Sequence, residues 1–310
     1  MTDYLGQVLE NHLAEIQESL PKTTDSRRIL HGRGKLHAGL EDINIDWFDP
    51  VLFISLYSES SHLNLLSILT DIFNRSMGRI ETVVVQQRYL PDSPSMVVCG
   101  ELQPPHYAVW HSLKFSIEFG HQQNVGFFLD MEAGRVWLEQ NARGARVLNL
   151  FAYTCALSVV AAQAGADSIV NVDMSSRALS RGRDNHKIND LANTPVTYLC
   201  ENILKSWGRI RKKGPFDVII FDPPSYQKGS FIAKRDYAKL IKRIPELSAD
   251  NCRILTCLNA PELDGDFIPS LFNTNLPDAG LCEKLPMHKD FADINESKAL
   301  KLYCYNYSKL

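Results

Sequence analysis

Two aspartates stand directly after apolar, strand-like segments, where a carboxylate can receive a ligand. Asp173 follows Ser168–Val172, and Asp222 follows Asp217–Phe221. In a doubly wound α/β sheet, ligands lie beyond the carboxyl ends of the strands, and an acid roughly 20 residues after the first turn accepts hydrogen bonds from ribose hydroxyls. Asp173 lies at about that distance from the turn that follows the apolar run Arg146–Tyr153. Asp173 therefore predicts a ribose-containing ligand.

The turn after the first strand differs from a dinucleotide-binding turn. Phe151–Ala156 contains no glycine, whereas a G-x-G-x-x-G turn lets the backbone approach a pyrophosphate. We therefore expect an adenosine without a pyrophosphate, for which S-adenosylmethionine is the leading candidate. The alternative is a crossover that binds no ligand, because an acid at the end of a strand is common.

The tripeptide Asp222-Pro223-Pro224 is the most specific chemical signal in the chain. Two prolines fix the backbone and remove two amide donors, so their carbonyl groups can face a substrate. A carboxylate beside a rigid carbonyl can receive an amino group or position a base, and Tyr226 can stack on a heterocycle. The structural alternative is a rigid turn between a strand and a helix.

The elements that must position these residues alternate between strand and helix. After Arg146–Tyr153 and Ser168–Val172, strands are expected at Val196–Leu199, Asp217–Phe221, Arg253–Leu258, Leu281–Leu285 and Lys301–Tyr307. Helices are expected at Ala156–Ala164, from Ser175 or Ser176 to Asn189, at Ile203–Arg211, in the basic segment after Tyr226, and at Asp266–Phe272. This alternation predicts an α/β sheet with helices on both faces.

The segment before Gly120 is interpreted as a smaller α+β domain. It contains an amphipathic helix over Tyr4–Leu20, a helix at His62–Arg75, and strands at Ile43–Phe48, Val51–Tyr57, Glu81–Tyr89, Ser95–Leu102 and Val109–Phe119. Gly120–Asn124 has the composition of a domain junction. We therefore divide the chain into domains 1–119 and 120–310.

Composition gives weaker indications. The net charge of −3 is not that of a typical nucleic-acid-binding domain, although basic patches at Arg27–Lys35, Arg209–Lys213 and Lys234–Arg243 can hold phosphates. The first of these stretches is expected to form a basic loop interrupted by glycines. It lacks the residue spacing of a Walker phosphate-binding motif, and the alternative is a turn exposed to solvent. No apolar run approaches the ~20 residues of a membrane helix, and the N-terminus lacks a signal-type core. We expect a cytoplasmic protein.

The seven cysteines form no C-x-x-C pair. Most of them lie in apolar, strand-like runs, which is typical of reduced thiols in a core. Zinc ligation is not expected, and the sequence predicts no metal site.

From about Gly120 to Leu310 the chain resembles the class I S-adenosylmethionine-dependent methyltransferases, and within them the bacterial large-subunit rRNA methyltransferases of the RlmI and RlmK type. The matching motifs occur in the same order over about 190 residues of the chain. They are Gly126–Asp130 with Arg135, Val147–Thr154, Val172–Ser175, Asn185–Asn189, Asp222–Pro224 and Asp290-Phe291.

The resemblance implies a Rossmann-like, seven-stranded sheet with a reversed last strand, and it implies roles for individual residues. Asn149–Thr154, which includes Phe151, Ala152 and Tyr153, would wrap the methionine part of S-adenosylmethionine. Asp173, followed by Met174, would hold the ribose, and Glu201-Asn202 would lie near the adenine. Phe128 and Asp130 would help to close the pocket, and Asp222 would border it.

Two departures from the family pattern affect the site. Cys155 stands where the family's turn normally has glycine, and a side chain there could crowd the cofactor. In the strand after the basic helix, Asn259 aligns with the cysteine of RlmI-like proteins, while Cys257 lies two residues earlier. Cytosine C5 methylation needs a cysteine nucleophile, and alternation along a strand places Cys257 and Asn259 on one face.

We therefore expect an enzyme that methylates a base of RNA, with rRNA as substrate and guanine favoured over cytosine C5. Asp222, the Pro223 carbonyl and Asn259 would contact the edges of the base, Pro224 would keep the turn rigid, and Tyr226 would stack. A methyltransferase for a small molecule or a protein is the second hypothesis, which the net charge suits. A non-catalytic binding protein, with Cys155 marking a degenerate pocket, is the third.

Overall fold

The computed structural model describes residues 24–59, 65–76, 78–120 and 122–309. They divide into two compact units, of which the first comprises the described part of Met1–Leu129 with Lys289–Ile294, and the second comprises Asp130–His288 with Asn295–Leu310. The expected helix Tyr4–Leu20 lies outside the described residues. The predicted domain boundary between residues 119 and 120 stays a prediction.

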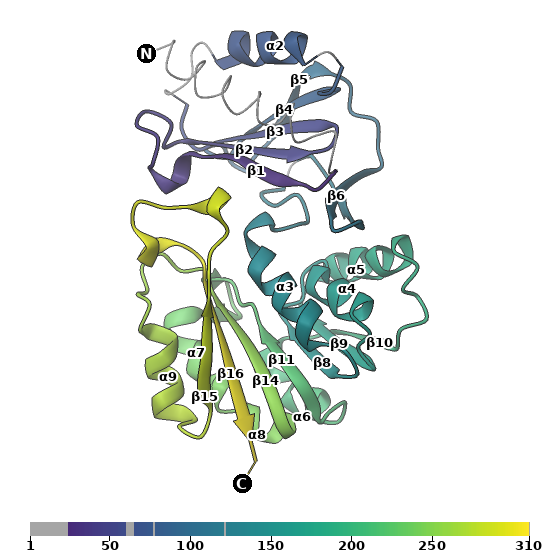
Figure 1. Cartoon of the computed structure of the whole chain (residues 1–310), viewed down its shortest axis with the longest axis vertical. Coiled ribbons are helices and arrows are strands. Elements are labelled where there is room, and N and C mark those ends of the chain that lie inside the picture. The colour runs from purple at the N-terminus through teal and green to yellow at the C-terminus, as the bar shows by residue number, and fades with distance from the viewer. Residues whose placement is uncertain (1–23, 60–64, 77, 121, 310) are drawn as a thin grey trace. The chain divides into compact units, whose positions relative to one another are not determined.

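The second unit is built on a seven-stranded sheet (Figure 1). Its strand order is β10-β9-β8-β11-β14-β16-β15, and every neighbouring pair is parallel except the two that β16 makes. The strands are β8 (Arg146–Leu150), β9 (Ser168–Asp173), β10 (Val196–Cys200), β11 (Phe216–Phe221), β14 (Ser248–Leu258), β15 (Gly280–Leu285) and β16 (Lys301–Ser308). The expected α/β sheet with one reversed strand is confirmed.

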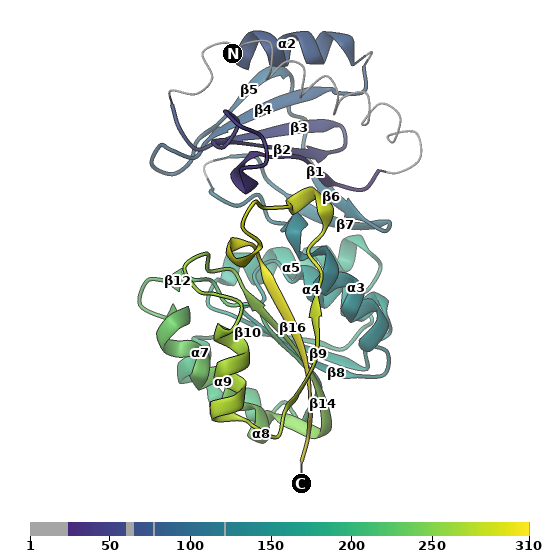
Figure 2. The ribbon, with the colours of Figure 1, turned by 60° about the vertical axis from the view of Figure 1, so that its left-hand side comes forward.

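Helices cover both faces of this sheet (Figures 1 and 2). One face carries α3 (Glu132–Asn141), α4 (Ala156–Gln163) and α5 (Ser176–Ile188), and the other carries α6 (Trp207–Arg211), α7 (Ala233–Ile241), α8 (Ile244–Leu247) and α9 (Phe267–Asn275). On the second face, residues of the four helices and of β8, β11, β14 and β16 form one apolar core. Since the central strands are covered on both sides, they read as continuous apolar runs rather than alternating ones.

The first unit contains a five-stranded sheet of order β1-β2-β3-β4-β5, in which only β3 and β4 are parallel. These strands are β1 (Arg27–His31), β2 (Ile43–Phe48), β3 (Val51–Leu56), β4 (Thr82–Gln87) and β5 (Ser95–Gly100). Helix α2 (Leu65–Arg75) connects β3 to β4 and packs on one face of the sheet. The smaller α+β region is thus present.

One expected strand is wrong. Val109–Phe119 is not a single strand, because β6 (His106–Trp110) and β7 (Leu113–Ile117) form an antiparallel hairpin. His111 and Ser112 connect them with φ angles of 45° and 71°. Two-residue hairpin turns of this kind usually have asparagine, aspartate or glycine at both positions, so His111-Ser112 is not recognisable as a turn from residue types alone.

The segment Lys289–Ile294, which we call the strap, connects β15 to β16 but belongs to the first unit. The guanidinium of Arg28 lies over the ring of Phe291 at 4.9 Å, and Arg27 pairs with Asp290 at 3.3 Å. The Ile294 amide donates to the Gly34 carbonyl at 2.8 Å. The strap is therefore fixed to the start of the first unit's sheet.

Candidate active site

The turn after β8 follows a strained path. Phe151, Tyr153 and Cys155 have φ angles of 61°, 46° and 60°, in the left-handed region that costs a non-glycine residue about 1–2 kcal/mol. Strained backbone persists only where its surroundings hold it, and it is concentrated at functional sites. The turn is therefore a candidate binding element.

Several hydrogen bonds hold this turn. The Cys155 amide donates to the Ala152 carbonyl at 2.7 Å, and the Ala152 amide donates to the Val172 carbonyl at 3.1 Å. From α5, Asn185 Nδ2 donates to the Thr154 carbonyl at 2.9 Å. The turn is thus fixed to β9 and to α5, and Thr154 is itself buried.

Asn149 lies one residue before the end of β8 and is also buried. Its Nδ2 donates to Asn171 Oδ1 at 2.9 Å, and Asn171 donates in turn to Ser158 Oγ at 2.8 Å. Ser158 contacts His186 Nε2 at 3.1 Å, and burial lowers the pKa of this histidine. A chain of neutral hydrogen bonds therefore joins β8 to α5. Among the described residues, Asn149 Oδ1 has no partner.

Cys155 points into the core. Its side chain has no exposed area and packs with Ala152, Leu179 and Tyr198. On α5 it lies against Gly182, where an added Cβ would fall 2.8 Å from the Cys155 Cβ and closer still to its sulfur. Because Gly182 has no side chain, it leaves room in the core for Cys155, the residue that replaces the family's glycine. Crowding of the cofactor by Cys155 is therefore no longer expected.

Asp173 ends β9 and is oriented by the turn. Its Oδ2 accepts the Tyr153 amide at 2.9 Å, and its Oδ1 accepts the Ser175 amide at 2.8 Å. Each carboxylate oxygen has two lone pairs, so each can accept one more hydrogen bond. Asp173 therefore offers two fixed acceptors, which suits the two hydroxyls of a ribose.

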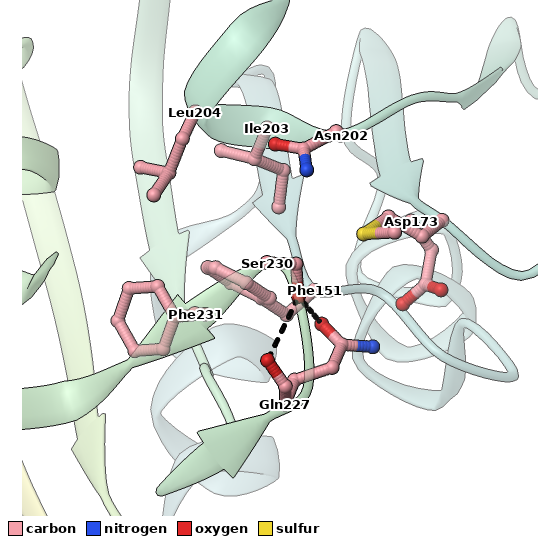
Figure 3. A pocket seen from close by; sticks show the side chains of 9 residues that line it. Phe151, Asp173, Asn202, Ile203, Leu204, Gln227, Ser230 and Phe231 are labelled. Atoms are coloured by element: carbon pink, nitrogen blue, oxygen red, sulfur yellow. Dashed lines mark hydrogen bonds between the residues drawn. The ribbon is translucent and has the colours of Figure 1, made fainter.

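A pocket opens beside Asp173 (Figure 3). The pocket is small, with an empty volume of ≈ 260 Å³ that includes open solvent, so it would take one end of a ligand. Its lining residues come from the turn, the ends of β9 and β10, and the segment after Pro224. They are Phe151, Asp173, Met174, Asn202, Ile203, Leu204, Gln227, Ser230 and Phe231.

This lining fits a nucleoside. Apolar side chains from Phe151, Ile203 and Leu204 can contact a planar base, and the Asn202 amide can both donate to and accept from its edge. Asp173 supplies the acceptors for the sugar. The residues present therefore fit the adenosine part of S-adenosylmethionine.

A second cluster lies where β11 and β14 end. Phe221 pairs with Thr256, and Pro224 makes an isolated bridge with Asn259. Asp222–Pro224 and Cys257–Asn259 therefore run side by side at the carboxyl edge of the sheet. Of these residues Asn259 is exposed, whereas Pro223 is buried.

Asp222 titrates near neutrality. Burial and the nearby Asp130 carboxylate raise its pKa to about 7, against a smaller lowering by a side-chain hydrogen bond with Cys257. Asp130 lies in a 3₁₀ turn, Leu129–Met131, directly before α3. Asp130 and Asp222, both expected from the sequence, are thus close enough to interact electrostatically.

Cys257 has no exposed area. Burial, together with the neighbouring Asp222 charge, raises the pKa of its thiol well above the ordinary value. The backbone carbonyl of Cys257 accepts a hydrogen bond from Tyr237 Oη at 3.0 Å. Cys257 is therefore a protonated core thiol, although the exposed Asn259, which directly follows β14, lies only two residues later.

The remaining predicted residues lie as follows. Tyr226 is 64% exposed, directly after the proline turn. Glu201 accepts hydrogen bonds from Ser206 Oγ at 3.0 Å and from Arg209, and it is its neighbour Asn202 that lines the pocket. Phe128 belongs to the first compact unit and is 38% exposed.

The basic stretch Arg27–Lys35 is not a loop, and this expectation is wrong. Arg27–His31 forms β1, and Arg28 pairs with Asp46. A Cβ at Gly32 or Gly34 would overlap backbone oxygens of Leu40 or Ala292. The glycines are thus needed for close packing, which a pattern of basic residues and glycines does not reveal.

Most cations of the other two basic stretches are paired. Arg209 pairs with Glu201, Arg211 and Arg243 pair with Glu246, and Arg235 and Lys239 pair with Asp236. Lys212, Lys213 and Lys242 precede β11 or β14 and so lie at the amino edge, opposite the site.

Sequence reasoning missed five lining residues of the pocket. Ile203 and Leu204 follow Asn202, whereas Gln227, Ser230 and Phe231 belong to a small hairpin, β12 (Tyr226–Gln227) with β13 (Phe231–Ile232). Strands of two residues are too short for an alternation of apolar and polar residues to be visible in the sequence. Gly229, with a φ of 76°, was the available turn signal.

The described residues contain neither a candidate metal cluster nor a candidate membrane-spanning helix. No group of three histidine, cysteine, aspartate or glutamate side chains could hold a metal ion there. Within the same residues, no helix is both long enough and apolar enough to cross a membrane. All seven cysteines are free thiols.

Curated proteins similar to this chain include proteins from two bacterial species. Ribosomal RNA large subunit methyltransferase I of Escherichia coli (strain K12) is 30% identical over 208 residues, which are 65% of this chain and 52% of the relative. The protein of the same name from Shigella dysenteriae is 29% identical over the same coverage. The chain thus spans about half the length of the curated relatives it matches.

Solved structures share the fold. A chain from Streptococcus mutans, described as a SAM-dependent methyltransferase, has a TM-score of 0.85 at 22% identity and covers 98% of this chain and 81% of its own. A second structure with the same scores is described as a methyltransferase complexed with SAH. At this identity the likeness concerns the fold.

The family model of S-adenosylmethionine-dependent methyltransferases matches residues 27–306, nearly the whole chain. This match agrees with the strained turn, the strand-end aspartate and the pocket beside that aspartate. It confirms the family and the cofactor expected from the sequence, and the chain belongs to the S-adenosylmethionine-dependent methyltransferase family.

Proposed function

We propose that this protein transfers a methyl group from S-adenosylmethionine to a base of RNA, with rRNA as the substrate. The observation that carries the proposal is the bridge between Pro224 and Asn259, which holds Asp222 and Asn259 at the same edge of the sheet, directly before the hairpin that lines the nucleoside pocket. The names of the curated relatives support rRNA as the substrate class. The alternative is a small molecule or a protein as methyl acceptor.

Each part of the site has a proposed role. When bound, the cofactor supplies a methyl group activated on a sulfonium. Asp173 holds the ribose and Asn202 the adenine, while the turn Asn149–Thr154 contacts the methionine part. Asp222 and the Pro223 carbonyl contact the edge of the target base. Holding the reactants in line is the enzyme's main contribution to such a displacement.

Tyr226 and Asn259 complete the substrate side. The exposed ring of Tyr226 is available for stacking. Asn259 carries both donors and an acceptor, so it can pair with a base edge. Met174, which lines the pocket, is assigned to the border of the cofactor site.

Guanine is favoured over cytosine C5 as the target. A C5 reaction needs an accessible thiolate, whereas Cys257 has no exposed area and a strongly raised pKa. The exposed position at this edge belongs to Asn259 instead. Guanine N7 is nucleophilic without losing a proton, so it requires no such thiolate.

RNA phosphates would meet lysines at the carboxyl edge of the sheet. Lys205, Lys228 and Lys234 are exposed there and have no ion pair among the described residues. Each such contact weakens as salt rises. We assign a further RNA contact to the domain 1–119, and we place the protein in the cytoplasm because rRNA is its proposed substrate.

The proposal is tested with methyl-labelled S-adenosylmethionine and rRNA from cells that lack the gene, both as deproteinised RNA and as ribosomal subunits. Labelled nucleosides are then separated. We expect the native protein to place label in a methylguanosine. The Asn259→Ala variant should lose this label, and the Cys257→Ala variant should keep it. Label in 5-methylcytidine would contradict the choice of base. If neither substrate is labelled while a control methyltransferase is active on the same RNA, the methyl acceptor would be a small molecule or a protein instead.

A further inference from the structure

The hairpin after the proline turn carries side chains toward the nucleoside pocket. Tyr226 pairs with Ile232 and Gln227 with Phe231. The Ser230 amide donates to the Gln227 carbonyl at 3.1 Å, and Gly229 supplies the positive φ that the turn requires. Gln227 and Ser230 thus face each other across the tip of the hairpin.

The base of the hairpin is anchored in the core. Phe231 is 1% exposed, and its ring packs edge-on against Phe151 at 5.0 Å. The Ile232 amide donates to Asp236 Oδ2 at 2.9 Å, and the Ala233 amide donates to the Ser225 carbonyl at 3.0 Å. The base of the hairpin, beside Gln227, is therefore set by the fold.

The amide of Gln227 is oriented by Ser230. Ser230 Oγ donates to Gln227 Oε1 at 2.6 Å, which fixes the oxygen toward the hairpin tip and leaves the nitrogen on the other side. In Figure 3 the amide nitrogen extends away from Ser230 and toward the side of the pocket where Asp173 is drawn. No described residue is recorded as accepting its hydrogens.

The neighbours of Gln227 face away from the pocket. Successive side chains of a strand point to opposite sides, and Tyr226, directly before Gln227, is 64% exposed. Lys228, at the tip, is exposed as well. The hairpin is therefore two-sided, with an amide toward the cofactor and an aromatic ring and a cation toward solvent.

We propose that Gln227 is a cofactor-binding residue, held by Ser230, whose Nε2 donates a hydrogen bond to the nucleoside of S-adenosylmethionine. Through this bond the cofactor fixes the hairpin that presents Tyr226 to the substrate, so the cofactor binds before RNA. The contact itself depends only on membership of the family, whereas the binding order rests on the proposed RNA substrate.

The contact is tested by calorimetric titration of S-adenosylhomocysteine without RNA. Gln227→Met keeps the length of the side chain but removes the donor, and it should weaken binding roughly five- to tenfold, as expected for one hydrogen bond. Ser230→Ala should weaken binding less, and it should add nothing in the Gln227→Met background. Gln163→Met, the same change at an exposed glutamine at the end of α4, should bind like the native protein.

Protease digestion gives a second readout. Trypsin can cleave after Lys228 at the exposed tip, and the fragments identify this cut. Saturating S-adenosylhomocysteine should protect Lys228 in the native protein and fail to do so in Gln227→Met. This difference depends on the hydrogen bond, since both proteins are saturated with ligand.

Equal affinity of native protein and Gln227→Met would overturn the proposal, and so would additive effects of the Gln227 and Ser230 changes. If the Met variant has an altered circular dichroism spectrum, Gln227→Glu replaces it. This variant keeps the shape but lacks the donor, and it should bind at least as weakly. A native protein that binds S-adenosylhomocysteine but methylates no RNA would refute the proposed substrate and leave the Gln227 contact standing.

Discussion

Replacing Gly182 by alanine adds one methyl group to α5 directly against Cys155. The new Cβ would lie 2.8 Å from the Cys155 Cβ and 3.4 Å from the Thr154 carbonyl oxygen. Cys155 cannot retreat, because its side chain has no exposed area and packs with Ala152 and Leu179. The substitution therefore overpacks the junction between α5 and the cofactor turn.

Two opposing effects set the magnitude. Overpacking a core by a methyl group costs about 1–3 kcal/mol, whereas glycine to alanine inside a helix gains about 1 kcal/mol. Gly182→Ala alone should thus lower the free energy of unfolding by about 0–2 kcal/mol. In the Cys155→Gly background the clash is absent, and Gly182→Ala should raise the free energy of unfolding by about 1 kcal/mol.

The assay is thermal and urea unfolding of the native protein, both single variants and the double variant. For a unit of this size, 1 kcal/mol shifts the midpoint by roughly 2–4 °C. Gly208→Ala is the matched control, because an added Cβ on that helical glycine meets no atom within 4 Å. This control should not destabilise the protein.

The coupling between residues 155 and 182 is the decisive quantity. Pairs in contact deviate from additivity, whereas independent sites add to within about 0.5 kcal/mol. If Gly182→Ala has the same effect in both backgrounds within that margin, Cys155 does not occupy the space that Gly182 provides. The cysteine would then have to lie elsewhere, and the cofactor pocket would be the nearest alternative.

Three further predictions concern charge and the thiol. The folded-state pKa of Asp222, about 7, exceeds its ordinary value of 3.8, so its contribution to stability falls as pH rises from 4 to 7, by at most about 1.4 kcal/mol per pH unit. Asp222→Asn should remove this dependence of stability on pH. If the variant and the native protein show the same change in urea-unfolding free energy between pH 4 and 7, the prediction is contradicted. Cys257→Ala should keep methyl transfer within a few-fold in a filter-binding assay, since the thiol is buried and protonated; loss of turnover in a folded variant would restore it as the nucleophile. Asp236→Ala leaves the Ile232 amide without its acceptor and should lower the free energy of unfolding by about 1–3 kcal/mol, whereas Asp184→Ala, which breaks an exposed pair with Lys187, should change it by less than about 1 kcal/mol.

The sequence predicted the sheet because its central strands are continuous apolar runs separated by clear helices. Asp173 and Asp222 were found for the same reason, since each directly follows such a strand. The reversed direction of β16 was predicted from the family resemblance. An apolar run has the same composition whether it pairs in parallel or antiparallel, so the residues of β16 do not indicate its direction. The assignment of individual site residues and the domain boundary stay predictions.

What could not be predicted depends on long-range packing or on unusual backbone. The left-handed residues Phe151, Tyr153 and Cys155 carry no local signal, since their strain is compensated by β9 and α5. The compensation between Cys155 and Gly182 joins positions 27 apart in the chain and needs coordinates to be seen. The pairing of basic residues with Glu246 and Asp236 likewise depends on which helices meet.

The strap has a consequence for how the protein is made. The first unit begins to leave the ribosome before the second, yet Phe291 and Asp290 contribute contacts to it from near the other end of the chain. Domains usually complete folding in the order of synthesis, but this unit gains its last contacts only after residue 294 has been made. β16, which joins β14 to β15 in the other sheet, begins at residue 301. The two units therefore complete folding almost together, and a fragment that ends at residue 129 leaves the first one unfinished.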